Sequence, residues 1–371
     1  MFKFSKPKTK HRPDYVFICC VIILSVFGLL MLSSASSDLG KEKFNDTYYY
    51  LKHQILYGFS LGIVGLFITI KFYYKNLEKF APFLLLVSII ALILVFSPLG
   101  ISYSKGASRW LTLGPISIQP AELLKISFIL YLAAWLSNLR ANRQASFYKG
   151  FLPLLAISGL VAFLILSQPA TTTFVIIMFS AMTVYFISGA KLHHILGIAL
   201  IGIVAISLVI VSSGYRYNRI KAYFNNESNL ETIGYQLNQS KMAIGSGGLF
   251  GVGFGKSTIK NKYLPESIGD SIFSVIANEF GFVGVSTLIS VFLVLIIRGF
   301  YIAKKSRDQF AKFTVIGFIS IIAIQAFVHM ASNSGLLPLT GIPLPFISFG
   351  GTSLAAFLTM TGIIANISKY T

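Results

Sequence analysis

The segments GYQLNQSKMAIGSGGLFGVGFGKS, residues 234–257, and KNKYLPESIGDSIF, residues 260–273, interrupt an otherwise apolar chain. Between Gly214 and Asp270 the hydrophobic runs stop, whereas every other connection between such runs is short. Asp270 stands directly before the next apolar run. A carboxylate at a boundary between water and membrane, beside basic residues, is suited to proton chemistry on a substrate carried by a lipid. We therefore expect the chemistry that faces water to lie in this interruption.

The composition is typical of an integral membrane protein. Of the 371 residues, 55% are hydrophobic and 12% are charged, and the mean hydropathy is +0.74. A soluble domain would have about 25% charged residues. Apolar runs that approach the roughly 20 residues of a spanning helix recur along the chain. They predict an all-α polytopic membrane protein with ten transmembrane helices: Tyr15–Ala35, Gln54–Phe72, Phe80–Leu99, Ile118–Ser137, Phe151–Ser167, Thr171–Ser188, His194–Ser213, Ser271–Tyr301, Phe313–Gly335 and Pro345–Ser368.

One membrane domain over residues 1–371 is expected, with residues 214–270 as its large extracytoplasmic loop between helices 7 and 8. The first apolar run follows a basic start and resembles a signal peptide. Its length and the nine runs after it favour an uncleaved first helix.

The distribution of Lys and Arg predicts the orientation. With the N-terminus in the cytoplasm, the inner connections hold most of the basic residues in short loops, as the positive-inside rule requires. An even number of spans then places the C-terminus in the cytoplasm too. The net charge of +19 is spread over these connections, so nucleic-acid binding is excluded, although contact with anionic lipids is compatible with it. The two cysteines, Cys19 and Cys20, are adjacent and indicate neither a disulfide framework nor a metal cluster.

Two charged residues, Glu122 and Lys125, fall inside the fourth predicted span. They are three positions apart, so they share one helix face and can pair. Burial of such groups costs about 2.5–3.5 kcal/mol each on insertion scales. A structural ion pair and a polar wall of a substrate cavity are equally good interpretations of this pattern.

Arg109 and Trp110 precede that span at the predicted outer surface. A Trp there is usually a membrane anchor and an Arg there usually extends toward the head groups. The less common alternative is that Arg109 binds a phosphate, because a guanidinium can hold two phosphate oxygens.

Six glycines crowd residues 245–255. Such a run can expose backbone N–H groups to an anion, but the spacing is not that of a phosphate-binding loop. We favour a tight turn or a close approach of helices. Just upstream, Gln236, Gln239, Ser240 and Lys241 are able to share one polar helical face.

Asp270 has two interpretations from chemistry alone. Asp is favoured as the N-cap of a helix, where it contributes about 0.5–2 kcal/mol. The same position suits a general base, because the positive end of the helix stabilises the carboxylate. Capping is the commoner role.

Near the C-terminus, LPLTGIPLPFISFGGTS (337–353) is apolar but broken by prolines and glycines. Irregular backbone at membrane depth is tolerated where protein buries it or where it lines a cavity. The segment therefore predicts a pocket beside the last helix, with Asn333 and Ser348 as candidate polar groups.

Four segments in this order resemble the SEDS family (shape, elongation, division and sporulation), the RodA/FtsW polymerases of the bacterial cell wall. They are GASRWLTLGPISIQPAELLK (106–125), GYQLNQSKMAIGSGGLFGVGFGKS (234–257), YLPESIGDSIFSVIANEFGFVG (263–284) and LLPLTGIPLPFISFGGTSL (336–354). The resemblance covers nearly the whole chain, and the last two segments are more similar to the division member, FtsW, than to RodA.

The resemblance implies ten transmembrane helices in the bacterial cytoplasmic membrane and polymerisation of glycan strands from lipid II. It implies Asp270 as the catalytic acid/base and Glu122 and Lys125 as functional residues of the fourth helix. Arg109, Gln239 and Lys241 lie in motif segments and are further candidates for substrate binding. The implied partners are a class B penicillin-binding transpeptidase and other membrane proteins of division or elongation, and a divalent cation, Mg²⁺ or Mn²⁺, is a possible cofactor.

The chain departs from the family pattern at two places. Many relatives have His-Thr-Asp-Phe before the eighth helix, where this chain has Ile268-Gly269-Asp270-Ser271. Many relatives have an Asp after Gln-Pro at the start of the sixth helix, where this chain has Ala170. A role of that Asp is either dispensable here or taken by other residues.

Two other functions stay open. A lipid II flippase would use Glu122 and Lys125 as a polar site in the middle of the membrane, and a scaffold of the division machinery would need no catalytic residue. The absence of a clear internal repeat argues slightly against a transporter.

Overall fold

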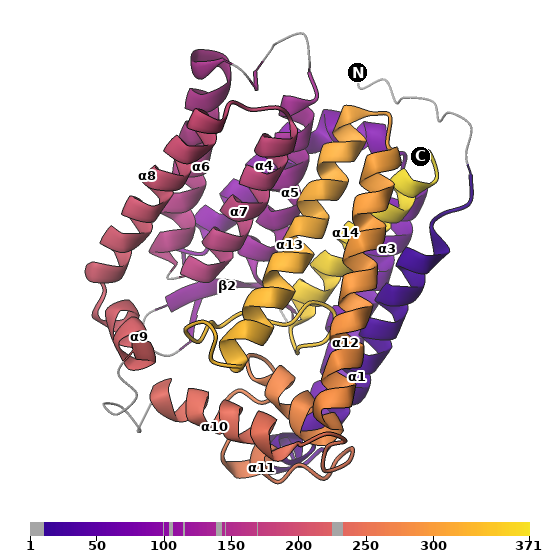
Figure 1. Cartoon of the computed structure of the whole chain (residues 1–371), viewed down its shortest axis with the longest axis vertical. Coiled ribbons are helices and arrows are strands. Elements are labelled where there is room, and N and C mark those ends of the chain that lie inside the picture. Colours follow the sequence, from indigo (N-terminus) through magenta and orange to yellow (C-terminus); the bar gives the residue numbers. More distant parts are fainter. Residues whose placement is uncertain are drawn as a thin grey trace.

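The computed structural model describes residues 11–98, 100–103, 107–113, 116–138, 143–144, 146–168, 170–224 and 233–371. Long helices run side by side between two ends of the molecule (Figure 1). The beginning and the end of the described chain meet at one of these ends, where the backbone N–H of His11 donates to the carbonyl of Lys369 at 2.8 Å.

Each predicted apolar run largely coincides with a helix. The principal helices are α1 (Tyr15–Phe44), α3 (Ser60–Lys71), α4 (Tyr74–Leu94), α5 (Pro120–Leu136), α6 (Leu152–Ser167), α7 (Thr171–Ile187), α8 (Leu192–Val211), α12 (Ile272–Lys305), α13 (Gln309–Asn333) and α14 (Gly351–Ser368). α2 (Tyr49–His53) and the π-helical turn η1 (Gln54–Phe59) lead into α3, and a second π-helical turn, η3 (Phe147–Phe151), leads into α6.

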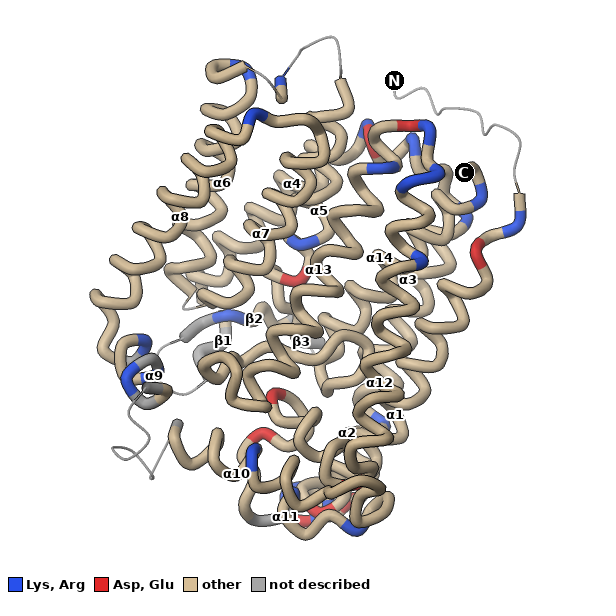
Figure 2. The backbone as a smooth tube through the Cα atoms, in the orientation of Figure 1, with Lys and Arg blue, Asp and Glu red and all other residues tan. Residues whose placement is uncertain are grey.

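In the described part of the chain, eight helical segments are long and apolar enough to cross a membrane. α7 is an apolar helix of 17 residues, and α5, also of 17 residues, carries Glu122 and Lys125. Charged residues gather at the two ends of the molecule, with few along the middle of the helices (Figure 2). These helices confirm the prediction of a mainly helical polytopic membrane protein. The number of ten crossings stays a prediction.

A small antiparallel sheet precedes α5, so the all-α prediction is incomplete. It consists of β1 (Gly100–Tyr103), β2 (Ala107–Leu113) and β3 (Ile116–Ile118) in the order β1-β2-β3. Leu111 pairs with Gly100 on one side and with Ile118 on the other. β-branched and aromatic residues, which favour strands, are frequent here, but these strands are short and the sequence interpretation treated the segment as a loop.

The interruption between residues 214 and 270 is a folded layer over the helix ends rather than one extended polar loop. It contains α9 (Gly214–Phe224), α10 (Ile233–Ser246) and α11 (Ile259–Lys262), and α10 packs against α12 (Figure 1). The predicted polar face of α10 is only partly correct. Gln236 donates to the Ser271 hydroxyl at 3.1 Å and Ser240 is fully buried, whereas Lys241 is exposed.

α12 is broken at Gly281, whose φ of 63° and ψ of −162° are not helical. The glycine-rich stretch lies against this break and exchanges backbone hydrogen bonds with it. Val252 N–H donates to Asn278 O at 3.0 Å, and Phe282 N–H donates to Gly248 O at 2.9 Å. The glycines therefore serve a close approach of two backbones, which confirms the favoured interpretation of the run.

A buried ion pair joins the same region to α1. Lys260 Nζ lies 2.7 Å from a Glu279 carboxylate oxygen, and the Ser34 hydroxyl of α1 donates to that carboxylate. Loss of one partner of a buried pair typically costs about 3–5 kcal/mol, because the other charge is left uncompensated. This pair holds α11, the first part of α12 and α1 together, and sequence reasoning missed it because its members are far apart in the chain.

We predict that Gly251→Ala lowers the free energy of unfolding by about 1–3 kcal/mol. A Cβ at Gly251 would lie 2.1 Å from the carbonyl oxygen of Glu279. Gly255→Ala is the matched control, since Gly255 also has a positive φ but no atom near its Cβ position. Thermal unfolding in detergent should show a clearly lower midpoint for Gly251→Ala than for Gly255→Ala, and equal midpoints would contradict the close approach.

Candidate active site

A cavity of about 450 Å³ lies at the end of the helices that is opposite to the chain termini, between the sheet, α7, α9 and the segment before α14. Its described lining includes the following residues: Arg109, Gln119, Ala170, Thr171, Thr172, Thr173, Arg216, Arg219, Asp270 and Leu337–Ile342. The prediction of a pocket beside the last helix is confirmed only in part. The cavity runs along Leu337–Ile342 of the irregular segment, but its described lining contains no residue of α14 and neither Asn333 nor Ser348. Asp270 is the only acidic residue among the described residues of this lining.

Asp270 is held through its backbone, which leaves its side chain on the cavity wall. The Asn333 side-chain amide donates to the Asp270 carbonyl at 2.8 Å, and the Ser348 hydroxyl donates to the Gly269 carbonyl at 2.8 Å. The N-cap of α12 is Ser271, without a side-chain capping bond. The capping interpretation of Asp270 is therefore wrong, because the helix begins one residue later than that role requires.

Three polar residues on one face of α13 support the cavity wall. Gln325, His329 and Asn333 are four residues apart and all buried, so they form a line along the helix. The Gln325 amide donates to Pro343 O at 2.9 Å, and His329 Nδ1 lies 2.8 Å from Ile342 O, where the carbonyl can only accept. These bonds satisfy carbonyls that irregular backbone would otherwise leave unpaired at membrane depth.

Glu122 and Lys125 form an ion pair behind that wall. Lys125 Nζ lies 2.7 Å from Glu122 Oε1 and donates to Gln325 Oε1, also at 2.7 Å. Both charged residues are almost fully buried, with relative exposures of 2% and 1%, and neither lines the cavity. Hydrogen bonds connect the pair through Gln325 to the carbonyl of Pro343, the residue after the lining residue Ile342.

Three arginines come together around the cavity from two distant parts of the chain. Arg109 lies on β2 and donates through Nε to Gln168 O at 3.0 Å. Arg216 and Arg219 lie on α9; Arg216 donates to Leu166 O at 3.0 Å, and Arg219 donates to Leu339 O at 3.4 Å. Sequence reasoning identified Arg109 but missed the two α9 residues. Their spacing of three in the basic helix GYRYNRIKAYF was the available signal.

The pKa of Asp270 is raised to about 7, mainly by burial and also by the Glu266 carboxylate, while Arg219 and Arg109 act in the opposite direction. A carboxyl group is normally ionised well below that pH. A pKa near 7 lets the carboxylate accept a proton and release it again at physiological pH, which is the property of an effective general base.

The other two predicted site residues do not line the cavity. Gln239 and Lys241 are on α10, and neither is part of the described lining. The aliphatic part of Lys241 lies against Gly335, where a Cβ would approach its Cε at 2.2 Å. α10 itself reaches the neighbour of Asp270, because Gln236 donates to the Ser271 hydroxyl.

The positive charge in the described lining of this cavity comes from side chains. No group of three His, Cys, Asp or Glu side chains comes together in the described part of the chain. Ala170, at the position where many relatives have an acid, lines the cavity next to three threonines and adds no metal ligand. Three guanidinium groups instead supply the positive charge.

Comparisons with known proteins cover nearly the full length of the chain. The family described as "Cell cycle protein", of FtsW, RodA and SpoVE, matches residues 14–371. The chain is 38% identical over 364 residues to "Probable peptidoglycan glycosyltransferase FtsW" of Trichlorobacter lovleyi, covering 98% of this chain and 95% of that protein. It is 35% identical over 362 residues to "Stage V sporulation protein E" of Bacillus subtilis, covering 97% and 98%.

Solved structures share the fold. The rod shape determining protein RodA of Thermus thermophilus is similar with a TM-score of 0.72 and 26% identity, covering 97% of this chain and 98% of that chain. A chain from a peptidoglycan synthase complex is similar in fold, with a TM-score of 0.78 at 24% identity, covering 96% and 98%. The chain therefore belongs to the SEDS family of FtsW, RodA and SpoVE cell cycle proteins, and it is FtsW-like.

Proposed function

We propose that the chain is a peptidoglycan glycosyltransferase that polymerises lipid II at the outer face of the bacterial cytoplasmic membrane. The observation that carries this proposal is the cavity whose lining contains one carboxyl group of raised pKa and three arginines. A sugar hydroxyl needs a base, a departing pyrophosphate needs positive charge, and this one cavity offers both. The names of the relatives support the same activity.

The proposed reaction is an inverting transfer of the glycan. Asp270 takes the proton from a hydroxyl of the acceptor sugar, and that oxygen forms a bond to the anomeric carbon of the donor. The bond from this carbon to the lipid-linked pyrophosphate breaks, and the leaving group departs with the electron pair. Arg109, Arg216 and Arg219 stabilise its negative charge.

The roles of the remaining predicted residues follow from their positions. Glu122 and Lys125 act as positioning residues, because their contact with Gln325 supports the cavity wall from behind. Gln239 and Lys241 are proposed to contact parts of the substrate or growing strand outside the cavity. The polyprenyl tails stay in the bilayer beside the helices.

The membrane arrangement proposed here has ten spans, both termini in the cytoplasm and the layer of residues 214–270 outside. The distribution of Lys and Arg supports it. A class B penicillin-binding transpeptidase is the proposed partner, and the likeness in fold to a chain of a complex that couples polymerization with crosslinking supports that proposal. The FtsW-named relatives favour a division role.

The alternative of a lipid II flippase receives less support. The polar site that it would use, Glu122 and Lys125, is a closed ion pair with its lysine also bonded to Gln325. A polymerase makes glycan chains in detergent, where no second leaflet exists, whereas a flippase makes none. This assay distinguishes the two functions directly.

We predict that Asp270→Asn lowers the polymerisation rate by at least about 10²-fold, because general-base catalysis typically contributes 10²–10⁴-fold. The amide has nearly the same shape, so binding of lipid II should largely persist. Glycan formation from lipid II by purified protein, together with lipid II binding, measures both effects. Full activity of Asp270→Asn would eliminate Asp270 as the base.

The polymerisation rate should rise with pH through about 7, since the base must lose its proton to act and the pKa of Asp270 is about 7. Glu266→Gln removes a negative charge that raises this pKa, so the midpoint of the pH profile should move to lower pH. Glu42→Gln, an exposed acid on α1, is the control that leaves the midpoint unchanged. A midpoint that moves upward in Glu266→Gln contradicts the assignment.

Arg219→Gln should lower kcat/KM for lipid II by about 10- to 150-fold, the equivalent of one hydrogen bond to a charged group at 1.5–3 kcal/mol. The loss should persist at pH values well above the pKa of Asp270, which separates phosphate binding from an effect on the base. Lys221→Gln, an exposed cation of the same helix that does not line the cavity, is the matched control. An equal loss in both variants would show that only general charge matters.

A further inference from the structure

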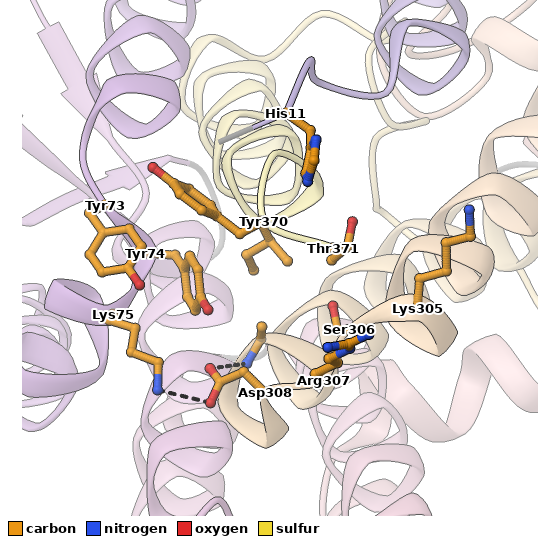
Figure 3. A pocket seen from close by; sticks show the side chains of 12 residues that line it. His11, Tyr73, Tyr74, Lys75, Lys305, Ser306, Arg307, Asp308, Tyr370 and Thr371 are labelled. Atoms are coloured by element: carbon orange, nitrogen blue, oxygen red, sulfur yellow. Dashed lines mark hydrogen bonds and ion pairs between the residues drawn. The ribbon is translucent and has the colours of Figure 1, made fainter. Parts of the chain in front are cut away.

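A second cavity, of about 520 Å³, lies at the opposite end of the molecule, where the termini of the described chain meet (Figure 3). Four segments that are distant in sequence form it. They are His11 before α1, Tyr73–Lys75 at the start of α4, Lys305–Asp308 between α12 and α13, and the residues that follow α14. The proposed reaction uses none of these residues.

The described lining of this cavity is positively charged. Lys75, Lys305 and Arg307 carry positive charge, and Asp308 is the only acid among the described lining residues. Asp308 is already engaged, since one oxygen lies 3.0 Å from Lys75 Nζ and the other accepts from the Ala311 N–H that it caps. Lys305 and Arg307 therefore add positive charge that no acidic side chain among the described lining residues offsets.

Lys305 is the last residue of α12, and Arg307 follows it after Ser306, which has an extended conformation with φ −65° and ψ 120°. Both side chains come from the side of the cavity away from Tyr73 and Tyr74, and they extend in different directions (Figure 3). Both side chains are exposed at this end of the molecule, as a site for an anion from outside requires.

The opposite wall is an aromatic cluster. The ring centroids of Tyr73 and Tyr74 are 5.0 Å apart, and Tyr370 lies 5.0 Å from Tyr73 and 5.7 Å from Tyr74 (Figure 3). Tyr73 and Tyr74 are buried, so this wall is rigid. The hydroxyl of Ser306 and the side chain of His11 complete a polar rim that can exchange hydrogen bonds with a hydroxylated group.

The position along α12 places this cavity at the depth of lipid head groups. Ile297 is 66% exposed and Tyr301 is 42% exposed, which is typical of a lipid-facing helix that ends in an interfacial aromatic. Tyr15, at the start of the neighbouring α1, is 61% exposed. Lys305 follows Tyr301 by one helical turn, about 6 Å along the axis, and its Nζ lies 4.6 Å from the Tyr301 ring centroid.

We propose that this cavity binds the head group of an anionic glycerophospholipid, with its phosphate on Lys305 and Arg307. The hydroxyls of a glycerol head group would meet the polar rim, and the acyl chains would lie along α1 and α12 beside Tyr15 and Tyr301. The binding is non-covalent and independent of the reaction proposed at Asp270. The lipid would tie together the two chain ends and the α12–α13 connection.

The test uses the full-length protein in detergent with added dioleoylphosphatidylglycerol or dioleoylphosphatidylcholine. Native mass spectrometry counts bound lipid, and thermal unfolding reports stabilisation. We expect phosphatidylglycerol to bind and to raise the unfolding midpoint, and phosphatidylcholine to do neither. Lys305→Ala/Arg307→Ala should weaken phosphatidylglycerol binding by roughly 10- to 30-fold, since each cation near a membrane surface contributes on the order of a few-fold to ten-fold.

Lys304→Ala/Lys312→Ala is the matched control, because it removes one cation from the end of α12 and one from the start of α13 but none from the described lining. It should retain the binding. The unfolding midpoints without lipid show whether each variant is folded. Equal weakening in the two double variants, or equal binding of phosphatidylcholine, would overturn the proposal. Saturation of the site by glycerol 3-phosphate at the same concentration as the lipid would overturn the lipid assignment in favour of a soluble phosphate.

Discussion

The hydrogen bond from the Asn333 amide to the main-chain carbonyl of Asp270 is the constraint on which the candidate active site depends. Asp270 belongs to no helix, and its side chain makes no capping bond. Its place on the cavity wall is set by Asn333 on one side and by Ser348, which holds Gly269, on the other. Side-chain amides and hydroxyls can do this at membrane depth because they replace the water that irregular backbone would otherwise need.

The same kind of hydrogen bond, from a buried side chain to a main-chain carbonyl, recurs along α13. Gln325 and His329 hold the carbonyls of Pro343 and Ile342 in the way that Asn333 holds Asp270. One buried helix face therefore supports both the loop that carries Asp270 and the end of the segment 337–343, whose Leu339 carbonyl accepts from Arg219. The Glu122–Lys125 pair contributes to this arrangement, since Lys125 orients the Gln325 amide. The buried Glu122–Lys125 pair and the backbone around the cavity are thus joined by one network of hydrogen bonds.

Glycosyl transfer requires a base and positive charge for the leaving group, and different side chains of the cavity meet these two requirements. Burial keeps the pKa of Asp270 high enough for a base, while the arginines keep it from rising so far that the group stays protonated. The same guanidinium groups supply positive charge for a departing pyrophosphate. Ala170, in place of an acid, leaves the positive charge of this wall undiminished.

The sequence by itself determined the membrane character, because hydropathy is a local property that every apolar run displays. It also located the position of Asp270 before α12 and the role of the glycine run, and it indicated a pocket along the irregular segment, of which Leu337–Ile342 line the cavity. Only the tertiary structure decided that Arg216 and Arg219 join Arg109, that Gln239 and Lys241 lie outside the cavity, and that Lys260 pairs with Glu279. These facts depend on which helix ends pack together. Packing brings together residues that are distant in the chain, and the sequence pattern around each residue does not show which partner it will meet. The three-stranded sheet was not predicted for a related reason. Strands of three to seven residues are stabilised by pairing with their partners rather than by their own propensity.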